Sequence, residues 1–526
     1  MKTAEGTVVG DMTDVGVRAC TSCGSQLSRY NAGDTCASCA AVIAVDAGQR
    51  PAEPLAAGRL PDQAGQVLRA WRAAHHRSQA DVASALGMTQ QHLSQLENGR
   101  RAMSIDQRRL IVTELGIAPE DLGIAPAVPP RARVGDDADP AVAASRLAWR
   151  DQRRWLNQHR SELARLAASL YPDEQRIPRS PIIAAPAWRL DRPLELGTLE
   201  LDLDESPQTA AVTGDEKESS GVRPLRVSGN RFDRYTAAIR HLDPPRLFES
   251  RPSYRLLDVD LAQRQMRFGM AAYFDKLDIS EAVGHELAAA CMDAGSIPRS
   301  AVALAGRLPF RDLVGDPYDM QRRAIIPAIT TLTIRLRRHP APPSFLLHWR
   351  DPASVATAAG VYDVIPAGEF QPSSVALWDR QADFTLWRNI VREYSEELLG
   401  TPEHDGTRTQ PIDYNAWPLY RQLTEARVAG TAHAAVLGLG LDALTLAGTI
   451  LTVVVLDDDV FLDAFGDAVR FNDEGEIVSV GSGKPTDGIP FTEDSVRRML
   501  HTQPLASPGA ACLSLVSCAV NSFHML

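Results

Sequence analysis

The chain has 526 residues, of which 44% are hydrophobic and 23% are charged, a balance typical of globular proteins and unlike that of disordered ones. A single hydrophobic core rarely extends beyond roughly 250–300 residues, so we expect several domains. With 66 acidic and 55 basic residues the net charge is −11, which argues against a chain covered over its whole surface by nucleic-acid-binding groups.

The first feature along the chain is a cluster of four cysteines, CTSCGSQLSRYNAGDTCASC. Cys20 pairs with Cys23, and Cys36 with Cys39, each across two residues, so that both sulfurs of a pair can reach one Zn²⁺. We predict a four-cysteine zinc knuckle over residues 16–45, in which structural Zn²⁺ supplies the folding energy that so short a segment lacks. Two redox-active or incidental CxxC pairs are the alternative. The pattern leaves open whether the knuckle binds DNA, binds protein or braces a neighbour.

Residues 60–125 predict a bundle of short helices. An amphipathic helix carries Val67, Leu68 and Trp71, and a second one starts after the N-cap Ser78 and ends at Gly87. A third helix starts at Thr89, with its leucines inward and its glutamines outward, and a fourth starts at Ser104. The leucines are Leu93 and Leu96, and the glutamines are Gln90, Gln91 and Gln95.

Two short helices joined by a glycine turn, the second rich in glutamine, suit the major groove, because glutamine matches the donor and acceptor edge of adenine. The segment SQADVASALGMTQQHLSQLENG resembles the XRE class (Cro/C1 repressor type) of helix-turn-helix domains. The resemblance implies that Gln79 bonds a DNA phosphate, that the third helix touches base edges or the adjoining backbone, and that two residues after it hold the backbone. The base-contacting residues are Thr89, Gln90, Gln91 and Gln95, and the backbone-holding ones are Asn98 and Arg100.

The local charge agrees with DNA binding. Between Arg59 and Leu110 there are eight Arg and four acidic residues, an excess of +4. A scaffold for protein contacts is the alternative. Domains of this class usually read palindromes as dimers, so we expect double-stranded DNA with a palindromic operator as the partner of a homodimer.

Residues 140–245 predict a helical linker that includes a disordered polar loop, DESPQTAAVTGDEKESSG. Ala141–Tyr171 reads as one long helix with an apolar stripe, which is either a dimerisation helix or a helix packed on its own chain. The stripe consists of Leu147, Trp155, Leu163, Leu166 and Leu170.

A large mixed αβ region follows, assigned to residues 250–522. The apolar run Ala434–Leu456 is long enough to span a bilayer, but Asp442 and its β-branched second half favour a buried strand. His285 and Glu286 lack the second histidine of a zinc-protease helix and are expected at the surface.

The stretch WRNIVREYSEELLG places Glu393, Glu396 and Glu397 on one helix, opposite an apolar stripe. Alone, this is also the pattern of a solvated amphipathic helix. Together with the preceding YDVIPAGEFQP it resembles the Nudix family. The resemblance implies that the three glutamates hold Mg²⁺ or Mn²⁺ against the pyrophosphate of a nucleotide-like ligand, and that Arg392 supports a carboxylate.

The first half of that motif departs from the family. Trp378 and Phe384 stand where Gly and Glu are expected, unless Gly368 is the family's glycine and about ten residues, QPSSVALWDR, are inserted. Glu369 could then replace the missing glutamate.

The sequence thus predicts a multidomain protein with a small zinc ribbon or knuckle, an all-α repressor-like helix-turn-helix and a larger α+β Nudix-like C-terminal domain. We expect a cytoplasmic, nucleoid-associated transcription regulator that senses a nucleotide-like small molecule and does not enter membranes. The alternatives are a metal-dependent Nudix pyrophosphohydrolase carrying a DNA-binding module, and a protein-interaction module.

Overall fold

The computed structural model describes residues 63–86, 88, 90–98, 103, 105–123, 139–245, 248–350, 361–401, 410–466, 475–478 and 487–519. The predicted zinc knuckle, with Cys20, Cys23, Cys36 and Cys39, lies outside the described residues. So do Thr89 and Arg100 of the predicted DNA interface, and of Gln91 only the backbone is described.

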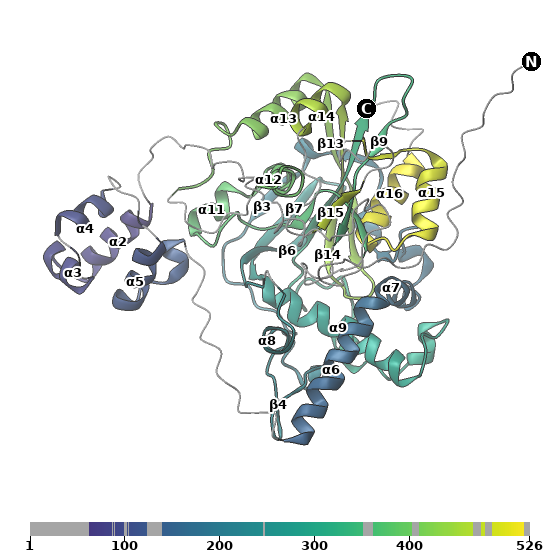
Figure 1. The fold of residues 1–526 in the computed structure, drawn as a ribbon, viewed down its shortest axis with the longest axis horizontal. Coiled ribbons are helices and arrows are strands. Elements are labelled where there is room, and N and C mark those ends of the chain that lie inside the picture. The colour runs from purple at the N-terminus through teal and green to yellow at the C-terminus, as the bar shows by residue number, and fades with distance from the viewer. Residues whose placement is uncertain are drawn as a thin grey trace, which may run out of the picture.

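A small helical bundle forms the N-terminal part of the described chain (Figure 1). Its elements are α2 (Gln63–Ala74), α3 (Gln79–Ala85), α4 (Gln90–Glu97), α5 (Ile105–Leu115) and the 3₁₀ helix η1 (Pro119–Leu122). Ser78 starts α3 as predicted: its hydroxyl accepts the Asp81 N–H at 3.1 Å, and the Asp81 carboxylate accepts the Ser78 N–H at 3.2 Å. Leu68, Leu93 and Leu96 are fully buried in a core separate from that of the rest of the chain.

The larger, α+β part of the described chain is built on a mixed sheet of eight strands. The strand order is β1-β13-β14-β8-β9-β16, with β2 pairing β13 and β12 pairing β8. β8 and β14 run parallel, and the other pairs are antiparallel. The bounds are β1 (Ile182–Ile183), β2 (Arg189–Glu195), β8 (Ala328–Leu336), β9 (Ser344–Phe345), β12 (Ala367–Glu369), β13 (Ala432–Asp442), β14 (Gly448–Asp457) and β16 (Ile489–Pro490).

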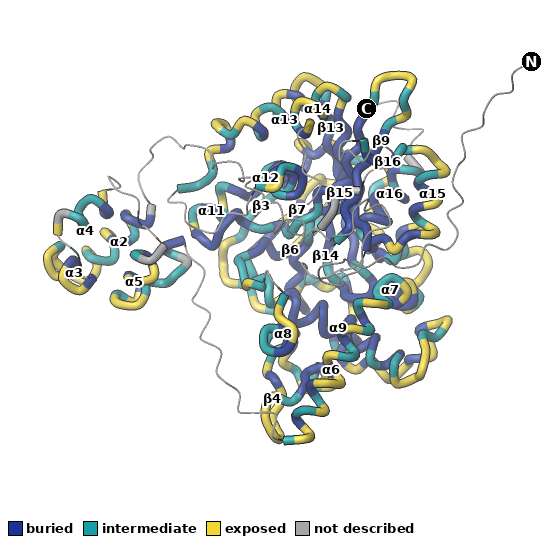
Figure 2. The backbone as a smooth tube through the Cα atoms, viewed as in Figure 1, coloured by how far each residue is buried: buried dark blue, intermediate teal, exposed yellow. Residues whose placement is uncertain are grey.

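Helices cover both faces of this sheet, so its central strands are dark blue over most of their length in Figure 2. α12, α13 and α14 lie on one face, and α16 lies on the other (Figure 1). The helices of the α+β region are α6 (Pro140–Gln158), α7 (Arg160–Ala168), α8 (Tyr235–Leu242), α9 (Tyr273–Asp293), α10 (Pro309–Val314), α11 (Leu377–Ala382), α12 (Leu386–Leu399), α13 (Pro418–Ala429), α14 (Asp458–Phe465), α15 (Glu493–Thr502) and α16 (Ser507–Ala519).

Three smaller sheets complete the described strands. One consists of β3 (Glu200–Leu203), β7 (Gln265–Ala272) and β6 (Pro252–Asp260). A second consists of β11 (Tyr362–Val364), β10 (Leu347–Arg350) and β15 (Gly475–Val478), and the third pairs β4 (Leu225–Val227) with β5 (Asn230–Arg231).

The apolar run Ala434–Leu456 forms most of β13 and β14, which confirms that it is core. Asp442 ends β13, and its carboxylate accepts the Thr445 N–H at 2.8 Å in the turn between the two strands. Among the described residues, none of the helices combines the length and the apolar character needed to cross a bilayer.

The single long helix expected over Ala141–Tyr171 is wrong, because the helix breaks at His159 into α6 and α7. Leu147 of the predicted stripe is 58% exposed, whereas Trp149 and Arg153 are buried. The buried face of α6 includes arginines, which a count of apolar residues omits. α6 packs on α9 of its own chain, so of the two interpretations the structure supports the intramolecular one.

The residues between α6 and α9 form a buried polar network. Arg153 Nη1 lies 3.2 Å from Glu281 Oε2 and donates to the Tyr235 hydroxyl at 3.4 Å. The Tyr235 oxygen lies 2.7 Å from His285 Nδ1, and His285 Nε2 lies 2.9 Å from Gln152 Oε1. Burial, with a smaller contribution from Arg153, lowers the pKa of His285 to about 3, so this imidazole is neutral at neutral pH.

Two further expectations are wrong. His285 and Glu286 are buried, and the Glu286 carboxylate accepts the N–H groups at the start of α10 at 2.7 and 2.9 Å. The polar segment expected to be a disordered loop is ordered: the Glu216 carboxylate accepts the Thr213 N–H at 2.6 Å, and Ser219 is fully buried. Short-range capping of this kind gives a polar sequence a defined structure that its composition does not reveal.

The segment 140–245, predicted as a helical linker, contributes strands to the same sheets as the region predicted from residue 250 onward. β1 and β2, which lie within the predicted 140–245 linker, pair with β13 of the main sheet, and β3 pairs with β7. The α+β region therefore starts at Pro140, with α6.

Candidate DNA-reading helices and glutamate helix

The buried carboxylate of Glu97 forms hydrogen bonds to two other helices of the N-terminal bundle. Glu97, at the end of α4, is 3% exposed. It accepts hydrogen bonds from Arg72 Nε at 2.6 Å, Arg72 Nη2 at 3.0 Å and Gln79 Nε2 at 2.8 Å. Hydrogen bonding of Arg72 to the Glu97 carboxylate, which accepts, raises the pKa of Arg72, and partial burial opposes this shift. One side chain thus joins α2, α3 and α4, and this arrangement of α3 against α4 is that of a helix-turn-helix.

A glycine allows α2 to cross α4 closely. A Cβ atom at Gly65 would lie 2.1 Å from the Leu96 carbonyl oxygen, a backbone atom that cannot move aside. Local sequence patterns do not reveal the structural roles of Gly65, Arg72 and Glu97. Their roles depend on contacts across about 25 residues or more, which local patterns do not show.

The predicted reading helix, α4, exposes part of its polar face. Gln90 is exposed and Gln95 half-buried, while Leu93 and Leu96 on the other side are fully buried. Asn98 is exposed just beyond α4, and its Nδ2 donates to the Ser94 carbonyl oxygen at 2.7 Å. Gln79 is half-buried at the first position of α3 and donates to Glu97, so in this structure its amide is already part of the scaffold.

The glutamate helix, α12, is capped at both ends. The Thr385 hydroxyl accepts the Arg388 N–H at 3.0 Å, and Gly400 ends the helix in the left-handed conformation with φ 66°. The apolar stripe is buried, including Val391 and Tyr394 with no exposure. The side expected to be solvated is covered as well, since Glu397 is only 4% exposed.

Arg392 lies within this covered side. Its Nη1 is 3.6 Å from Asp383 Oδ1 and donates to the Tyr414 hydroxyl at 3.0 Å, and its Nη2 donates to the Gln371 carbonyl oxygen at 2.6 Å. Burial opposes the charge, but Tyr414 and Asp383 outweigh it and raise the pKa of Arg392. The cation therefore holds the start of the loop before α11 against α12.

Two of the three glutamates of α12 lie against neighbouring residues of β12. Glu397 Oε1 accepts the Ala367 N–H of β12 at 2.9 Å. Glu393 lies against Gly368, where an added Cβ would come within 2.0 Å of its carboxyl carbon, and Glu396 is half-buried. Gly368 is therefore the residue that lets α12 approach β12.

Glu369 lies on the other face of the sheet. In the register of β12 with β8, Gly368 pairs with Ile329 and Glu369 pairs with Ala328, and successive side chains of a strand point to opposite faces. Since Gly368 faces Glu393, Glu369 faces away from α12, and its carboxylate pairs with Lys276 of α9. The sheet separates Glu369 from the three glutamates it was expected to join.

Within the described ranges, no three or more His, Cys, Asp or Glu side chains are grouped as a metal ion requires. Glu397 Oε1 accepts a backbone N–H, and Glu369 pairs with the ammonium group of Lys276 on the other face of the sheet. In this structure Glu369 therefore does not join the glutamates of α12 at one site.

The N-terminal bundle is similar to one family of known proteins. A helix-turn-helix family model matches residues 68–122, which run from within α2 to the end of η1. No curated protein matches the chain. The chain thus carries an XRE-type helix-turn-helix domain, beside a larger α+β region, and domains of this type are typical of DNA-binding transcription regulators.

Proposed function

We propose that the chain is a sequence-specific transcription regulator in which α4 enters the major groove and the α+β region senses a nucleotide-like ligand. The observation that carries the DNA-reading part is the exposed Gln90 on a helix whose opposite side is fully buried. The sensing part rests on the Nudix-like sequence around α12 and on the burial of Arg392 and Glu397 there.

Sensing fits the observed geometry better than hydrolysis does. Turnover of a pyrophosphate in the Nudix manner needs carboxylates converging on a divalent ion, and Glu369, the candidate for the family's first glutamate, lies on the other face of the sheet from α12. Binding of Mg²⁺ or Mn²⁺ at α12 and of structural Zn²⁺ at the four cysteines remain predictions, as does a homodimer on a palindromic operator. To move a two-state regulator from 1:99 to 99:1, a ligand must favour one state by about 5.5 kcal/mol.

A mobility-shift experiment tests the DNA-reading part. The full chain should bind random duplex DNA with an affinity that falls steeply with salt, because bound cations are released from the phosphates. Gln90→Ala should keep this nonspecific binding and lose sequence preference. Gln66→Ala, an equally exposed glutamine on α2, serves as the matched control. An affinity independent of salt would contradict the proposal.

A phosphate-release screen separates sensing from hydrolysis. The protein would meet nucleoside diphosphate conjugates with Mg²⁺ or Mn²⁺, beside a Glu396→Gln, Glu397→Gln double variant and the control Glu425→Gln, whose side chain is 72% exposed on α13. Turnover that only the double variant loses would identify a hydrolase and contradict the sensor. Binding without turnover would support the sensor.

A further inference from the structure

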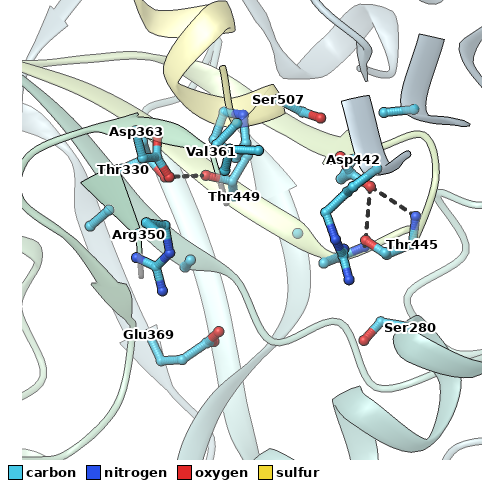
Figure 3. A pocket seen from close by; sticks show the side chains of 18 of the residues that line it. Ser280, Thr330, Arg350, Val361, Asp363, Glu369, Asp442, Thr445, Thr449 and Ser507 are labelled. Carbon is cyan, nitrogen blue, oxygen red and sulfur yellow. Dashed lines mark hydrogen bonds between the residues drawn. The ribbon is translucent and has the colours of Figure 1, made fainter. Parts of the chain in front are cut away.

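A cavity of about 240 Å³ lies on the face of the main sheet opposite α12 (Figure 3). Its floor is formed by β8, β12 and β14, and its walls by α7, α9 and the N-terminus of α16. All the residues that line it belong to the described part of the chain. The cavity is thus separated by the sheet from the glutamate helix.

Charged side chains of both signs line this cavity. Lys276 pairs with Glu369, and Arg160 Nη2 lies 3.3 Å from Glu281 Oε1. Figure 3 shows that Arg350, from β10, and Glu369 both extend into the cavity. The second carboxylate oxygen of Glu369, Oε2, is buried and has no hydrogen-bond partner among the described residues. A buried acceptor left unpaired costs about 1–3 kcal/mol, so a donor group on a bound molecule would be stabilised there.

Hydroxyl groups form another part of the lining. The Thr330 and Thr449 hydroxyls lie 3.1 Å apart on adjacent strands, and Ser280 and Ser507 lie on the walls. Ser507 is also the first residue of the 13-residue helix α16, and the Asp363 carboxylate, which lines the cavity too, already lies against the first turn of that helix at Gly509. The cavity therefore offers a cationic side formed by Arg350 and Lys276, a carboxylate acceptor and several groups that both donate and accept.

The volume limits what can enter. Its 240 Å³ is below the roughly 300–1,000 Å³ of sites for drug-sized ligands, so the cavity suits a small polar metabolite better than a whole nucleoside diphosphate conjugate.

We propose that this cavity is a second ligand site, which takes a small metabolite with one anionic group and at least one hydroxyl or amino donor. The donor pairs with Glu369 Oε2, and the anionic group lies beside Arg350 and Lys276. Sugar phosphates and α-amino acids share this chemistry. The site does not depend on the glutamate helix or on nucleotide sensing.

Calorimetric titration of the full chain tests this site. The probes are glucose 6-phosphate and ribose 5-phosphate in one arm, and the common α-amino acids in the other. We expect one arm to bind one molecule per chain, and Glu369→Gln or Thr449→Val to weaken binding at least tenfold. Both variants keep the size of the side chain, and Glu425→Gln should leave binding unchanged.

The arms give distinct outcomes. Binding of sugar phosphates alone identifies the anion as phosphate, and binding of amino acids alone identifies it as carboxylate. No binding in either arm overturns the proposal, as does binding that survives both substitutions in variants with wild-type circular dichroism. Both outcomes are independent of nucleotide binding at α12. The double variant Glu396→Gln, Glu397→Gln tests that binding separately.

Residues 371–380, the ten residues that interrupt the Nudix-like motif, contact the helix-turn-helix domain. Trp378, on α11, packs against the buried core of the helix-turn-helix domain. An added Cβ at Gly123, which follows η1, would lie 3.1 Å from both the Trp378 ring and the Ala376 Cβ atom. The indole nitrogen of Trp378 is buried. The inserted residues thus form the contact between the two regions.

The same segment is tied to the α+β region at its start. Arg392 of α12 donates to the Gln371 carbonyl oxygen at 2.6 Å, and the Asp383 carboxylate accepts the Ser373 N–H at 2.7 Å. The segment also follows β12 after one residue, Phe370. A short, hydrogen-bonded path therefore connects α12 and β12 to the segment that carries Trp378.

We also propose that residues 371–380 are the docking surface for the helix-turn-helix domain and couple the α+β region to DNA binding. Cysteines at Gly123 and Ala376 should form a disulfide, since disulfide Cβ atoms lie roughly 3.5–4.5 Å apart, close to the spacing here. The control pair is Gly116→Cys with Ala376→Cys, because a Cβ at Gly116 would have no atom within 4 Å. Peptide mass spectrometry detects the cross-link.

DNA affinity of the cross-linked and reduced forms then tests the coupling. We expect the Gly123 pair to cross-link at least tenfold faster than the control pair, and the cross-link to change DNA affinity at least fivefold. Equal cross-linking of the two pairs overturns the docking surface. Equal DNA affinity of the oxidised and reduced forms overturns the coupling.

Discussion

Removing the Glu97 carboxylate should destabilise the helix-turn-helix domain. Glu97→Ala takes away the acceptor of three hydrogen bonds, two from Arg72 and one from Gln79, at 2.6–3.0 Å. Breaking a buried charge pair by removing one partner costs about 3–5 kcal/mol. The Arg72 side chain is 19% exposed, so water can replace part of the loss. We therefore expect about 3 kcal/mol, the lower end of that range.

Native-state hydrogen exchange measures this cost locally. The opening free energy of α3 and α4 amides should fall by about 3 kcal/mol, a roughly hundredfold increase in the open population, while amides of the main sheet keep theirs. Glu114→Ala is the matched control, because Glu114 is exposed on α5 of the same domain. If Glu97→Ala and Glu114→Ala give the same exchange rates in α3 and α4, the hydrogen bonds to Glu97 do not stabilise the domain.

Three further predictions concern stability. Burial raises the pKa of Asp278 to about 6 from 3.8, and a carboxyl pKa raised on folding contributes stability that is present below pH 3.8 and lost as the pH rises through 6. The free energy of unfolding of Asp278→Asn, measured with urea, should therefore rise relative to that of the wild type by about 2–3 kcal/mol from pH 4 to pH 7.5. A difference between the two proteins that is the same at both pH values would refute this. Ser78→Ala removes the N-cap of α3 and should cost about 1 kcal/mol, measured by exchange of the α3 amides against a Ser84→Ala control at an exposed site. Gly65→Ala should cost about 1–3 kcal/mol or more, because its Cβ would meet the Leu96 oxygen; an unchanged melting temperature would contradict the close crossing.

The sequence predicted features that depend on neighbouring residues. The Ser78 cap and the inward leucines of α4 each follow from a few adjacent positions. The apolar run at β13 and β14 was assigned to the core because Asp442 and β-branched residues disfavour a membrane helix. In each case the local preference and the folded environment agree.

Features that depend on distant residues were missed or misassigned. The glutamate side of α12 looked solvated because its cover, β12, contacts it through Gly368, a residue with no side chain to reveal a packing role. α6 looked like a leucine stripe because its buried arginines count as polar until Glu281 and the Leu225 carbonyl oxygen are placed beside them. Glu369 was assigned to the wrong face because its strand register was unknown.

The central claim is that α4 reads a DNA sequence, and selection of binding sites from random duplex DNA by the full chain tests it most directly. At one fixed salt concentration we predict a palindromic motif with half-sites about 34 Å apart, or a multiple of that spacing. Gln90→Ala should lose about 1–3 kcal/mol of discrimination at one base position in each half-site, whereas Gln66→Ala should select the wild-type motif. Selection of no motif by the wild type, or of the same motif with the same affinity by Gln90→Ala, would contradict the account.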